Sequence, residues 1–324
     1  MCQRNKIILR LLPFALCAGL FSCSRNDHLV DFAYGYGTTW DIHLYEGTLE
    51  DLEEIKDYIM DTSRLLDLEA KNVPNGVYAL NHQGTIEADP FVMEAYLLAE
   101  SVRKQLPEGY SYTLGALSSA WAESLEKGEV LDAETVGDLL EKSRQTTVTF
   151  ISSTITKTGE GIVDFGSLGK GLCLRRIQDM LKRKNITKYL INAGTSSLLF
   201  GSNSSEKGTT KVHLRDAPGY YFEARDCSVS TSSTVQDRGD DQKNYVIDGV
   251  TYSHIIDPRS GMAHVDYQAC CLKGWDPAAL DAYSTAFMVL GEEVGKTFED
   301  RNIQVAFVKE GKISYASEGF LQKE

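Results

Sequence analysis

The sequence predicts a mixed α/β (α+β) fold, built as one globular body of two intertwined halves. Short β-rich runs and helical runs interleave along the chain, which favours one mixed body over separate all-α and all-β parts. At 324 residues with 42% apolar content, the chain is long enough to bury a large core. We find no internal repeat and no low-complexity linker that would divide it.

The amino terminus has the layout of a secretory signal peptide. Three basic residues, Arg4, Lys6 and Arg10, precede an apolar run over residues 11–21. This run is too short for a stable membrane span. We therefore expect an exported protein.

Leu20–Cys23 resembles a bacterial lipobox, in which the cysteine thiol is acylated and becomes the mature amino terminus. The resemblance implies a lipoprotein signal peptide over residues 1–22, a tether over 23–30 that follows lipidated Cys23, and a folded domain over 31–324. The alternative is an ordinary signal peptide that is cut nearby.

The charge of the mature chain argues against nucleic acid as a partner. Residues 1–22 hold three of the 33 basic residues and none of the 46 acidic ones, so their removal changes the net charge from −13 to −16. Backbone phosphates would be repelled by this excess of negative charge. The cysteines show no metal-ligand spacing, and Cys270–Cys271 lies in an apolar run that is typical of a core strand.

The first part of the chain predicts a strand pair followed by helices. Residues 29–45 alternate aromatic and small side chains around two glycines, which favours a strand broken by a close turn. Thr48 precedes apolar positions at helical spacing and a group of acids, so we expect a helix to begin there. Further helices are expected from Asp89–Pro90 through Val102 and after Asp132.

From residue 144 the chain changes to short β-rich runs, with a helix expected over residues 168–184. The end of the chain alternates helices with strands, and a polar loop is expected over 238–243. The strands expected after residue 144 are 146–152, 162–164, 189–192, 197–200, 211–214, 227–230, 304–308 and 313–316, and the late helices are 277–290 and 294–300.

The late helix carries a candidate metal site. On a helix, Asp281 and Thr285 lie one turn apart on the same face, and two oxygen ligands at that spacing suit a hard cation such as Mg²⁺. The alternative is an ordinary helix start, whose acid complements the dipole and whose threonine bonds back to the chain. An aspartate that faces the apolar run 286–291 would be costly unless it were paired or bound to a cation, which favours the metal.

The sequence of residues 162–171 predicts a strand that is followed, through a glycine-rich junction, by a helix. Such a junction offers backbone N–H groups and a positive helix end to a phosphate, and Lys170 adds charge. A Walker P-loop is excluded, because it would need glycine at Asp164 and Ser or Thr at Gly171. A plain strand-to-helix turn remains an equal alternative. The hydroxyl-rich run 229–234 either binds phosphate oxygens or fills a turn.

The segment 251–261 sets His254 and Asp257–Pro258 at the end of an apolar strand. An imidazole near neutral pH can act as the general base for an attacking hydroxyl. A single histidine on a strand is more often structural, and Asp257 can simply begin a type I turn.

Taken in order, these segments resemble the ApbE family of FAD:protein FMN transferases, over about residues 36–291. Eight stretches match the motifs of that family in the family's order. They are Tyr36–Thr38, Gly76–Asn81, Ser111–Trp121, Val163–Gly171, Asn192–Ser196, Thr231–Ser233, His254–Gly261 and Leu280–Ala286.

The resemblance implies a T-fold-like body and a Mg²⁺-dependent enzyme that transfers FMN from FAD to a Thr or Ser hydroxyl of an acceptor protein, with release of AMP. It implies that Asp281, Thr285 and the backbone carbonyl of Ser167 hold Mg²⁺, and that His254 activates the acceptor hydroxyl. The FAD contacts that it implies are Tyr36, Thr113, Leu114, Gly115, Asp164 and Lys170.

The resemblance also implies an acceptor of the kind found as flavin-carrying subunits of membrane redox complexes. It implies a chain that is lipid-anchored to a bacterial membrane and faces the periplasm. Ser167, Thr195 and Ser233 stand where the family usually has glycine. Two alternatives therefore stay open, namely a FAD-binding lipoprotein that has lost transfer and a Mg²⁺-dependent pyrophosphatase that yields FMN and AMP from FAD.

Overall fold

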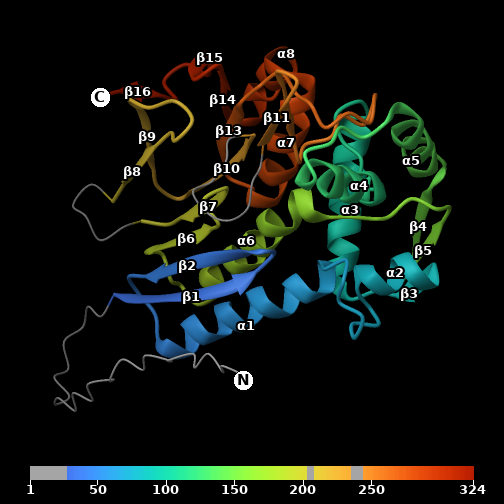
Figure 1. The fold of residues 1–324 in the computed structure, drawn as a ribbon. Helices are drawn as coiled ribbons and strands as arrows, with labels where there is room; N and C mark the ends of the chain where they lie inside the picture. Colours follow the sequence, from blue (N-terminus) through green and yellow to red (C-terminus); the bar gives the residue numbers. More distant parts are fainter. Residues whose placement is uncertain (1–27, 203–207, 235–243) are drawn as a thin grey trace, which may run out of the picture.

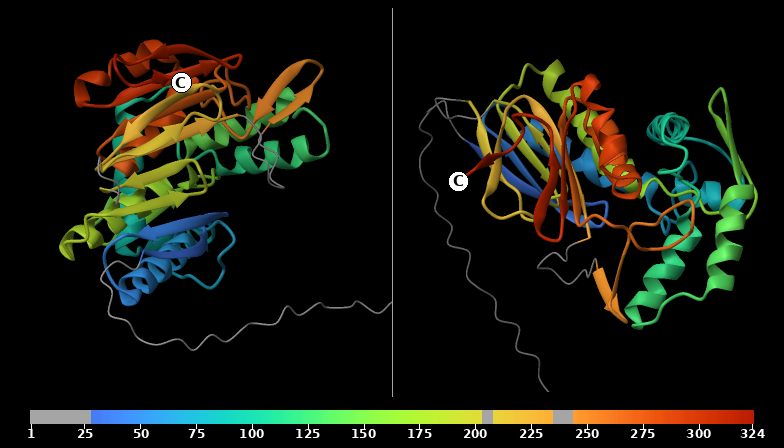
Figure 2. Two further views of the ribbon diagram at one scale, coloured as in Figure 1. Left: turned by 90° about the vertical axis from the view of Figure 1, so that its left-hand side faces the viewer. Right: turned by 90° about the horizontal axis from the view of Figure 1, so that it is seen from above.

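The computed structural model describes residues 28–202, 208–234 and 244–324. The expected signal peptide, Cys23, most of the tether and the expected polar loop therefore lie outside the described residues. A large sheet is covered by helices on one face and by a small sheet on the other, and a second lobe lies beside those helices (Figure 1, Figure 2). The predicted mixed α/β class is confirmed.

The large sheet has eight strands in the order β1-β2-β6-β7-β10-β13-β14-β15, and all neighbouring strands run antiparallel. β1 and β2 form the predicted strand pair, joined by Tyr36 and Gly37 at φ values of 56° and 71°. Positive φ at both turn residues marks a type I′ hairpin. The strands are β1 (Leu29–Gly35), β2 (Thr38–Leu44), β6 (Tyr189–Ala193), β7 (Ser197–Phe200), β10 (Cys227–Ser233), β13 (Ala269–Gly274), β14 (Gln304–Lys309) and β15 (Lys312–Ala316).

One face of this sheet packs against α1 (Leu49–Leu66), α6 (Gly166–Arg183) and α7 (Pro277–Leu290), and their apolar side chains form the largest core cluster. Local signals set the ends of these helices. Thr48 caps α1 in a capping box with Asp51, and Asp276 caps α7 just before a proline at its first position.

The other face of the sheet carries a three-stranded antiparallel sheet in the order β16-β9-β8, with a second apolar cluster between the two layers. The strands are β8 (Thr210–His213), β9 (Tyr220–Ala224) and β16 (Gln322–Lys323). β8 lies at the edge of this small sheet.

The second lobe has its own cluster around Trp121 and Tyr252, and it lies on the side of α6 and α7 away from the large sheet (Figure 2). Trp121 Nε1 donates to the carbonyl of Gly261, which fastens α4 to the loop that carries His254. The elements around this lobe are α2 (Val77–Gln83), β3 (Thr85–Glu87), α3 (Pro90–Gln105), α4 (Gly115–Glu126), α5 (Ala133–Gln145), β4 (Thr147–Ile151), β5 (Thr154–Thr158), β11 (Asn244–Ile247) and β12 (Val250–Ser253).

Two expected elements differ in the structure. Residues 162–164 form no sheet strand, because Asn81 pairs through its side chain with the N–H and C=O of Val163, and the neighbouring groups bond to Tyr112 and Gly115. The helix expected over 294–300 is split into α8 (Glu292–Lys296) and the 3₁₀ turn η1 (Glu299–Arg301).

Several elements were missed, notably α4, although Leu117, Trp121 and Leu125 recur along it at helical spacing and are all buried. No helix among the described residues is long and apolar enough to cross a bilayer.

Candidate functional site

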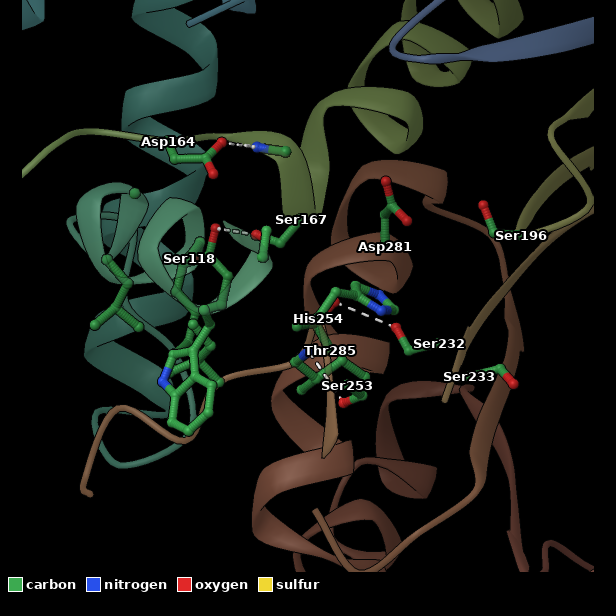
Figure 3. A pocket seen from close by; sticks show the side chains of 18 of the residues that line it. Ser118, Asp164, Ser167, Ser196, Ser232, Ser233, Ser253, His254, Asp281 and Thr285 are labelled. Atoms are coloured by element: carbon green, nitrogen blue, oxygen red, sulfur yellow. Dashed lines mark hydrogen bonds between the residues drawn. The ribbon is translucent and has the colours of Figure 1, made fainter. Parts of the chain in front are cut away.

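A cavity of about 560 Å³ lies between the two lobes, a size typical of small-molecule sites. Its walls come from one side of α4 along its length, the first turn of α6, the end of β10, the residues after β12 and one face of α7 (Figure 3). The structure brings most of the predicted site residues to this one cavity. Those that line it are Leu114, Gly115, Asp164, Ser167, Lys170, His254, Asp281 and Thr285.

Asp281 is the buried acid of the cavity, with 6% of its surface exposed. Its Oδ1 accepts hydrogen bonds from the hydroxyls of Ser197 (3.0 Å) and Ser230 (3.1 Å). Its Oδ2 accepts the backbone N–H of Gly171 at 2.8 Å. Among the described residues, no basic side chain pairs with it. A buried carboxylate held only by neutral donors keeps lone pairs that can bind a cation.

The bond from Gly171 also affects the first turn of α6. In a regular α-helix the N–H of Gly171 would donate to the carbonyl of Ser167. Here that N–H donates to Oδ2 of Asp281, so the Ser167 carbonyl receives at most a hydrogen bond that it shares with this carboxylate. This carbonyl is therefore suited to act as an oxygen ligand, the role that the family resemblance implies for it.

A chain of hydroxyls joins Asp281 to Thr285 along the face of α7. Ser284 lies 3.4 Å from Ser230 and 2.8 Å from Ser232, measured between hydroxyl oxygens. The Ser232 hydroxyl in turn lies 3.2 Å from the hydroxyl of Thr285. Figure 3 shows Asp281 and Thr285 on one side of α7 with Ser232 facing them.

This donor set fits a hard divalent cation. Within the described ranges, no three His, Cys, Asp or Glu side chains cluster as a metal site, so a site made mainly of such ligands finds no support there. One carboxylate, a threonine hydroxyl and a carbonyl are oxygen donors, which Mg²⁺ and Ca²⁺ prefer, and Mg²⁺ usually keeps several waters.

Asp164 and Lys170 flank the start of α6. Asp164 Oδ1 accepts the N–H of Gly166 at 2.7 Å, and burial raises the pKa of this carboxyl above its usual value, although that hydrogen bond opposes the shift. Lys170 is half-buried in the cavity wall and forms no ion pair with any described residue. Its ammonium is therefore available to an anionic ligand.

His254 directly follows β12, and its exposed side chain lies at the cavity between two buried neighbours, Ser253 and Ile255. Asp257 does not join it. Asp257 accepts the backbone N–H of Arg259 at 2.8 Å and pairs with the guanidinium of the same residue, as a turn residue does. Asp257 therefore serves as a turn residue, and its carbonyl accepts the N–H of Gly261 at 2.7 Å, which makes a wider turn than the type I turn that the sequence suggested.

Tyr36 does not line the cavity, so the expected direct contact with FAD is not supported. The type I′ turn directs its side chain beneath α6, where a Cβ added to Gly169 would meet the tyrosine ring at 3.0 Å. Its hydroxyl is buried, and burial raises the pKa of the phenol. Tyr36 therefore supports the helix that carries Lys170.

Thr113 is also absent from the cavity wall, although Leu114 and Gly115 line it. The Thr113 hydroxyl is buried and lies 2.8 Å from the hydroxyl of Ser143 at the end of α5. This bond turns the side chain away from the cavity and ties the start of α4 to α5.

The three residues in glycine positions leave the cavity open. Ser167 Oγ donates to the Tyr110 hydroxyl at 3.2 Å, and Ser233 Oγ donates to Asp216 at 3.2 Å. Thr195 keeps a φ of 63°, a left-handed conformation that favours glycine, and it lines the rim. The replacements therefore change the walls without filling the cavity.

Sequence analysis missed the serines that hold Asp281. Ser197 and Ser230 are each 1% exposed, and both donate to the same carboxylate oxygen. The sequence predicted either phosphate contacts or a turn for the run 229–234, and not the support of a carboxylate. Its alternation along a strand could have shown that Ser230 and Ser232 share one face.

Replacing Ser230 with Ala is expected to weaken metal binding about tenfold, because a carboxylate that loses a supporting hydrogen bond is less well oriented. The measurement is titration with Mn²⁺ in the absence of FAD, followed by the signal of the free ion in electron paramagnetic resonance. Ser228→Ala is the matched control, since Ser228 is equally buried on the same strand and its hydroxyl has no partner among the described residues. Equal affinities in the two variants would contradict this role.

Replacing Asp164 with Asn is expected to raise the free energy of unfolding at pH 7. Because burial raises the pKa of Asp164, the folded protein holds this proton more tightly than the unfolded chain does. The contribution of Asp164 to the free energy of unfolding is thus fully present below the pKa that this carboxyl has in the unfolded chain. It is lost as the pH rises through the pKa that the carboxyl has in the folded protein. Urea unfolding should show a gain in the free energy of unfolding that narrows as the pH is lowered toward the ordinary pKa of an aspartate carboxyl, and a constant gain would refute the assignment.

Comparison with known proteins gives consistent results. The model of the ApbE family matches residues 36–308. Over 257 residues the chain is 27% identical to an FAD:protein FMN transferase from Vibrio cholerae, covering 72% of this chain and 73% of the relative. Over 177 residues it is 27% identical to a protein of the same name from Treponema pallidum, covering 50% of this chain and 47% of the relative. The match to this second protein therefore spans about half of its length.

Solved structures share the fold. A variant of the flavin transferase ApbE from Vibrio cholerae superposes with a TM-score of 0.75 at 20% identity, covering 90% of this chain and 98% of that one. The ApbE protein from Thermotoga maritima gives a TM-score of 0.74 at 19% identity, covering 90% and 97%.

Proposed function

Since this chain belongs to the ApbE family, we propose that it is an enzyme that transfers FMN from FAD to a Thr or Ser hydroxyl of an acceptor protein and releases AMP. The names of the relatives supply the reaction class. The observation that carries the proposal is the single cavity in which Asp281, Lys170 and His254 meet.

The reaction exchanges one P–O bond for another. The acceptor oxygen forms a bond to the phosphorus on the FMN side of the pyrophosphate, and the bond from that phosphorus to the AMP phosphate breaks. The electron pair leaves with AMP. His254 takes the proton of the attacking hydroxyl, since imidazole is a base near neutral pH.

The residues around the pyrophosphate have complementary roles. Lys170 and the amino-terminal end of α6 stabilise negative charge on the phosphate oxygens. Asp281, Thr285 and the carbonyl of Ser167 would hold Mg²⁺, which when bound neutralises charge on the bridging and leaving oxygens.

The direct test combines the protein with FAD, Mg²⁺ and a flavin-carrying subunit of a membrane redox complex. Covalent flavin on the subunit is read as fluorescence in a denaturing gel, and AMP is measured by chromatography. The proposal expects both products, and both in equal amounts. AMP without any acceptor would instead indicate a pyrophosphatase, and saturable FAD binding without AMP would indicate a protein that only binds the flavin.

Replacing His254 with Asn is expected to lower the rate of transfer by about 10²–10⁴, the usual contribution of a general base. FAD affinity, measured by quenching of flavin fluorescence, should change little because the side chain is needed for proton transfer. Transfer at the rate of the unchanged protein would remove His254 from the mechanism.

We further propose that the chain is exported and lipid-anchored through Cys23, facing the periplasm beside flavin-carrying acceptor subunits. The layout of the first residues supports this proposal. Incorporation of labelled palmitate should occur in the full chain and disappear in the Cys23→Ala variant, whereas equal labelling of both would refute the anchor.

A further inference from the structure

The first strand of the large sheet, β1, presents three large apolar side chains to solvent. Val30, Phe32 and Tyr34 are 44%, 58% and 68% exposed. They occupy every second position of the strand, so all three point to the same face of the sheet. The residues between them face the other way, toward α1 and the main core. We call these three side chains the apolar row.

The apolar row takes part in none of the three apolar clusters that the described residues form. The small sheet lies on the same face of the large sheet, but its cluster is built on β7, β10, β13 and β14 and contains no residue of β1 or β2. Edge strands usually carry charged side chains that prevent association, and the apolar row has none. A continuous exposed row of this kind indicates an interaction surface.

The apolar surface is one strand wide. On β2 the residues paired with the row are His43, Asp41 and Thr39, all of them polar. Asp41 accepts a hydrogen bond from the side chain of Asn192 at 2.9 Å, so the polar border continues onto β6. A buried aromatic side chain covers only about 150–250 Å², so the row falls short of the roughly 800 Å² per partner of a stable protein interface.

The start of β1 is fixed close to the expected lipid anchor. The ring of His28 stacks on that of Tyr45 with centroids 4.4 Å apart, and its Nε2 lies 3.1 Å from Nδ1 of His43. His28 precedes Val30 by two residues, so its side chain lies on the face of the apolar row. Cys23 is five residues before His28, and five residues span at most about 18 Å. An anchor at Cys23 therefore keeps the row near the bilayer.

The chemistry of the row fits the membrane interface. Phenylalanine offers apolar surface, and tyrosine combines an apolar ring with a hydroxyl that can stay in water, which is why tyrosine is enriched at the level of the lipid headgroups. The mature chain is strongly acidic, so anionic lipids would not attract it. Contact with a bilayer through this face therefore depends on apolar surface and not on charge.

We propose that the apolar row docks on the membrane that holds the Cys23 anchor, with its three side chains in the interfacial region of the bilayer. This inference rests on the proposed anchor and goes beyond the proposed function, because it assigns the side of the molecule that faces the lipid. The row lines neither the first cavity nor a second, mainly apolar cavity of about 320 Å³, which adjoins the first at Thr195 and Thr231. Docking therefore does not occupy the proposed catalytic site.

The test measures contact between the row and lipid. The full lipidated chain is reconstituted in phosphatidylcholine vesicles whose acyl chains carry bromine near the headgroup, since bromine quenches indole fluorescence on contact. An interfacial side chain lies about 5–10 Å into the headgroup boundary, so the emission added by Phe32→Trp should fall about twofold or more relative to vesicles without bromine. The unchanged protein gives the background from the native tryptophans.

Ile151→Trp is the control. Ile151 is 75% exposed and belongs to β4, which lies on the opposite side of the molecule from β1 (Figure 1). Bromine should leave the emission that this substitution adds unchanged. Equal quenching of the two added indoles, whether strong or weak, would overturn the inference.

A charge in the row supplies a second measurement. Phe32→Asp, introduced together with Tyr34→Trp, should reduce the quenching of the added indole to the level of the control, because a carboxylate is costly to bury in lipid. Ile151→Asp in the same Tyr34→Trp background makes the same kind of change away from the row and should have no effect. High salt should not weaken the quenching, since apolar contacts are not screened. Quenching that survives Phe32→Asp would contradict the docking.

The failures can be told apart. Absence of palmitate on Cys23 would refute the anchor, and this inference with it, whereas FMN transfer is measured separately and would be unaffected. A palmitate-labelled protein whose row is not quenched would overturn the docking alone. If such a protein also formed a dimer that Phe32→Asp dissociates in sedimentation, a second copy of the chain, and not lipid, would cover the row.

Discussion

Replacing Asp281 with Asn is expected to lower FMN transfer by about 10³-fold or more, because a bound cation contributes several kcal/mol to stabilisation of the transition state. Asp281 supplies the carboxylate of the proposed metal site, and it also accepts the N–H of Gly171, which the Ser167 carbonyl therefore at most shares. Loss of its charge therefore affects two of the three expected ligands. The measurements are the rate of covalent flavin labelling and Mn²⁺ affinity.

Asn removes the charge and keeps the volume of the side chain, although its amide nitrogen would face the N–H of Gly171, which Oδ2 of Asp281 accepts. Asn retains an oxygen that can accept from Ser197 and Ser230, whereas Ala would leave those buried hydroxyls without an acceptor. Asp138→Asn is the control, since the side chain of Asp138 is 62% exposed and, within the described residues, its ion pair is with Lys142 on the surface of α5. Full transfer by Asp281→Asn, or lost transfer with unchanged Mn²⁺ affinity, would contradict the metal assignment.

Replacing Gly171 with Ala is expected to lower the free energy of unfolding by about 3 kcal/mol, the upper range for overpacking a core. A Cβ at this position would lie 2.3 Å from the carbonyl oxygen of Pro277 and 2.6 Å from Cβ of Asp281. α6 and α7 would have to separate at the site, so we expect transfer to be lost as well. Urea denaturation and flavin labelling check the two effects.

A second glycine provides the control. Gly137 lies inside α5, and a Cβ added there would meet nothing within 4 Å. Gly137→Ala should therefore raise the free energy of unfolding by about 0.5–1 kcal/mol, because glycine loses more freedom on folding. If both substitutions stabilised the protein, the close approach of α6 and α7 would be wrong.

The sequence predicted well those elements whose ends depend on neighbours in the chain. Thr48, Asp132 and Asp276 each cap a helix through a hydrogen bond to a backbone N–H two or three residues later. The strand expected over 162–164 failed because hydrogen bonds to remote groups, above all the side chain of Asn81, replace a sheet.

The candidate site also contains residues whose placement follows from the local sequence and residues whose placement depends on remote contacts. Asp281 and Thr285 lie one turn apart on α7, so their shared face followed from helical periodicity alone. Tyr36 and Thr113 were expected to contact FAD, yet a hairpin turn and a hydrogen bond to Ser143 direct them elsewhere. Each outcome depends on which partner the folded chain brings near.

The sequence by itself determined the mixed α/β class, most of the helices and the membership of a family, because caps, periodicity and ordered motifs act over short stretches. Only the tertiary structure decided what Gly171 does, which serines hold Asp281, and that a second apolar cavity adjoins the first. The physical reason is that a close approach, a buried hydrogen bond or a cavity is a property of atoms far apart in the chain, which local preferences cannot specify.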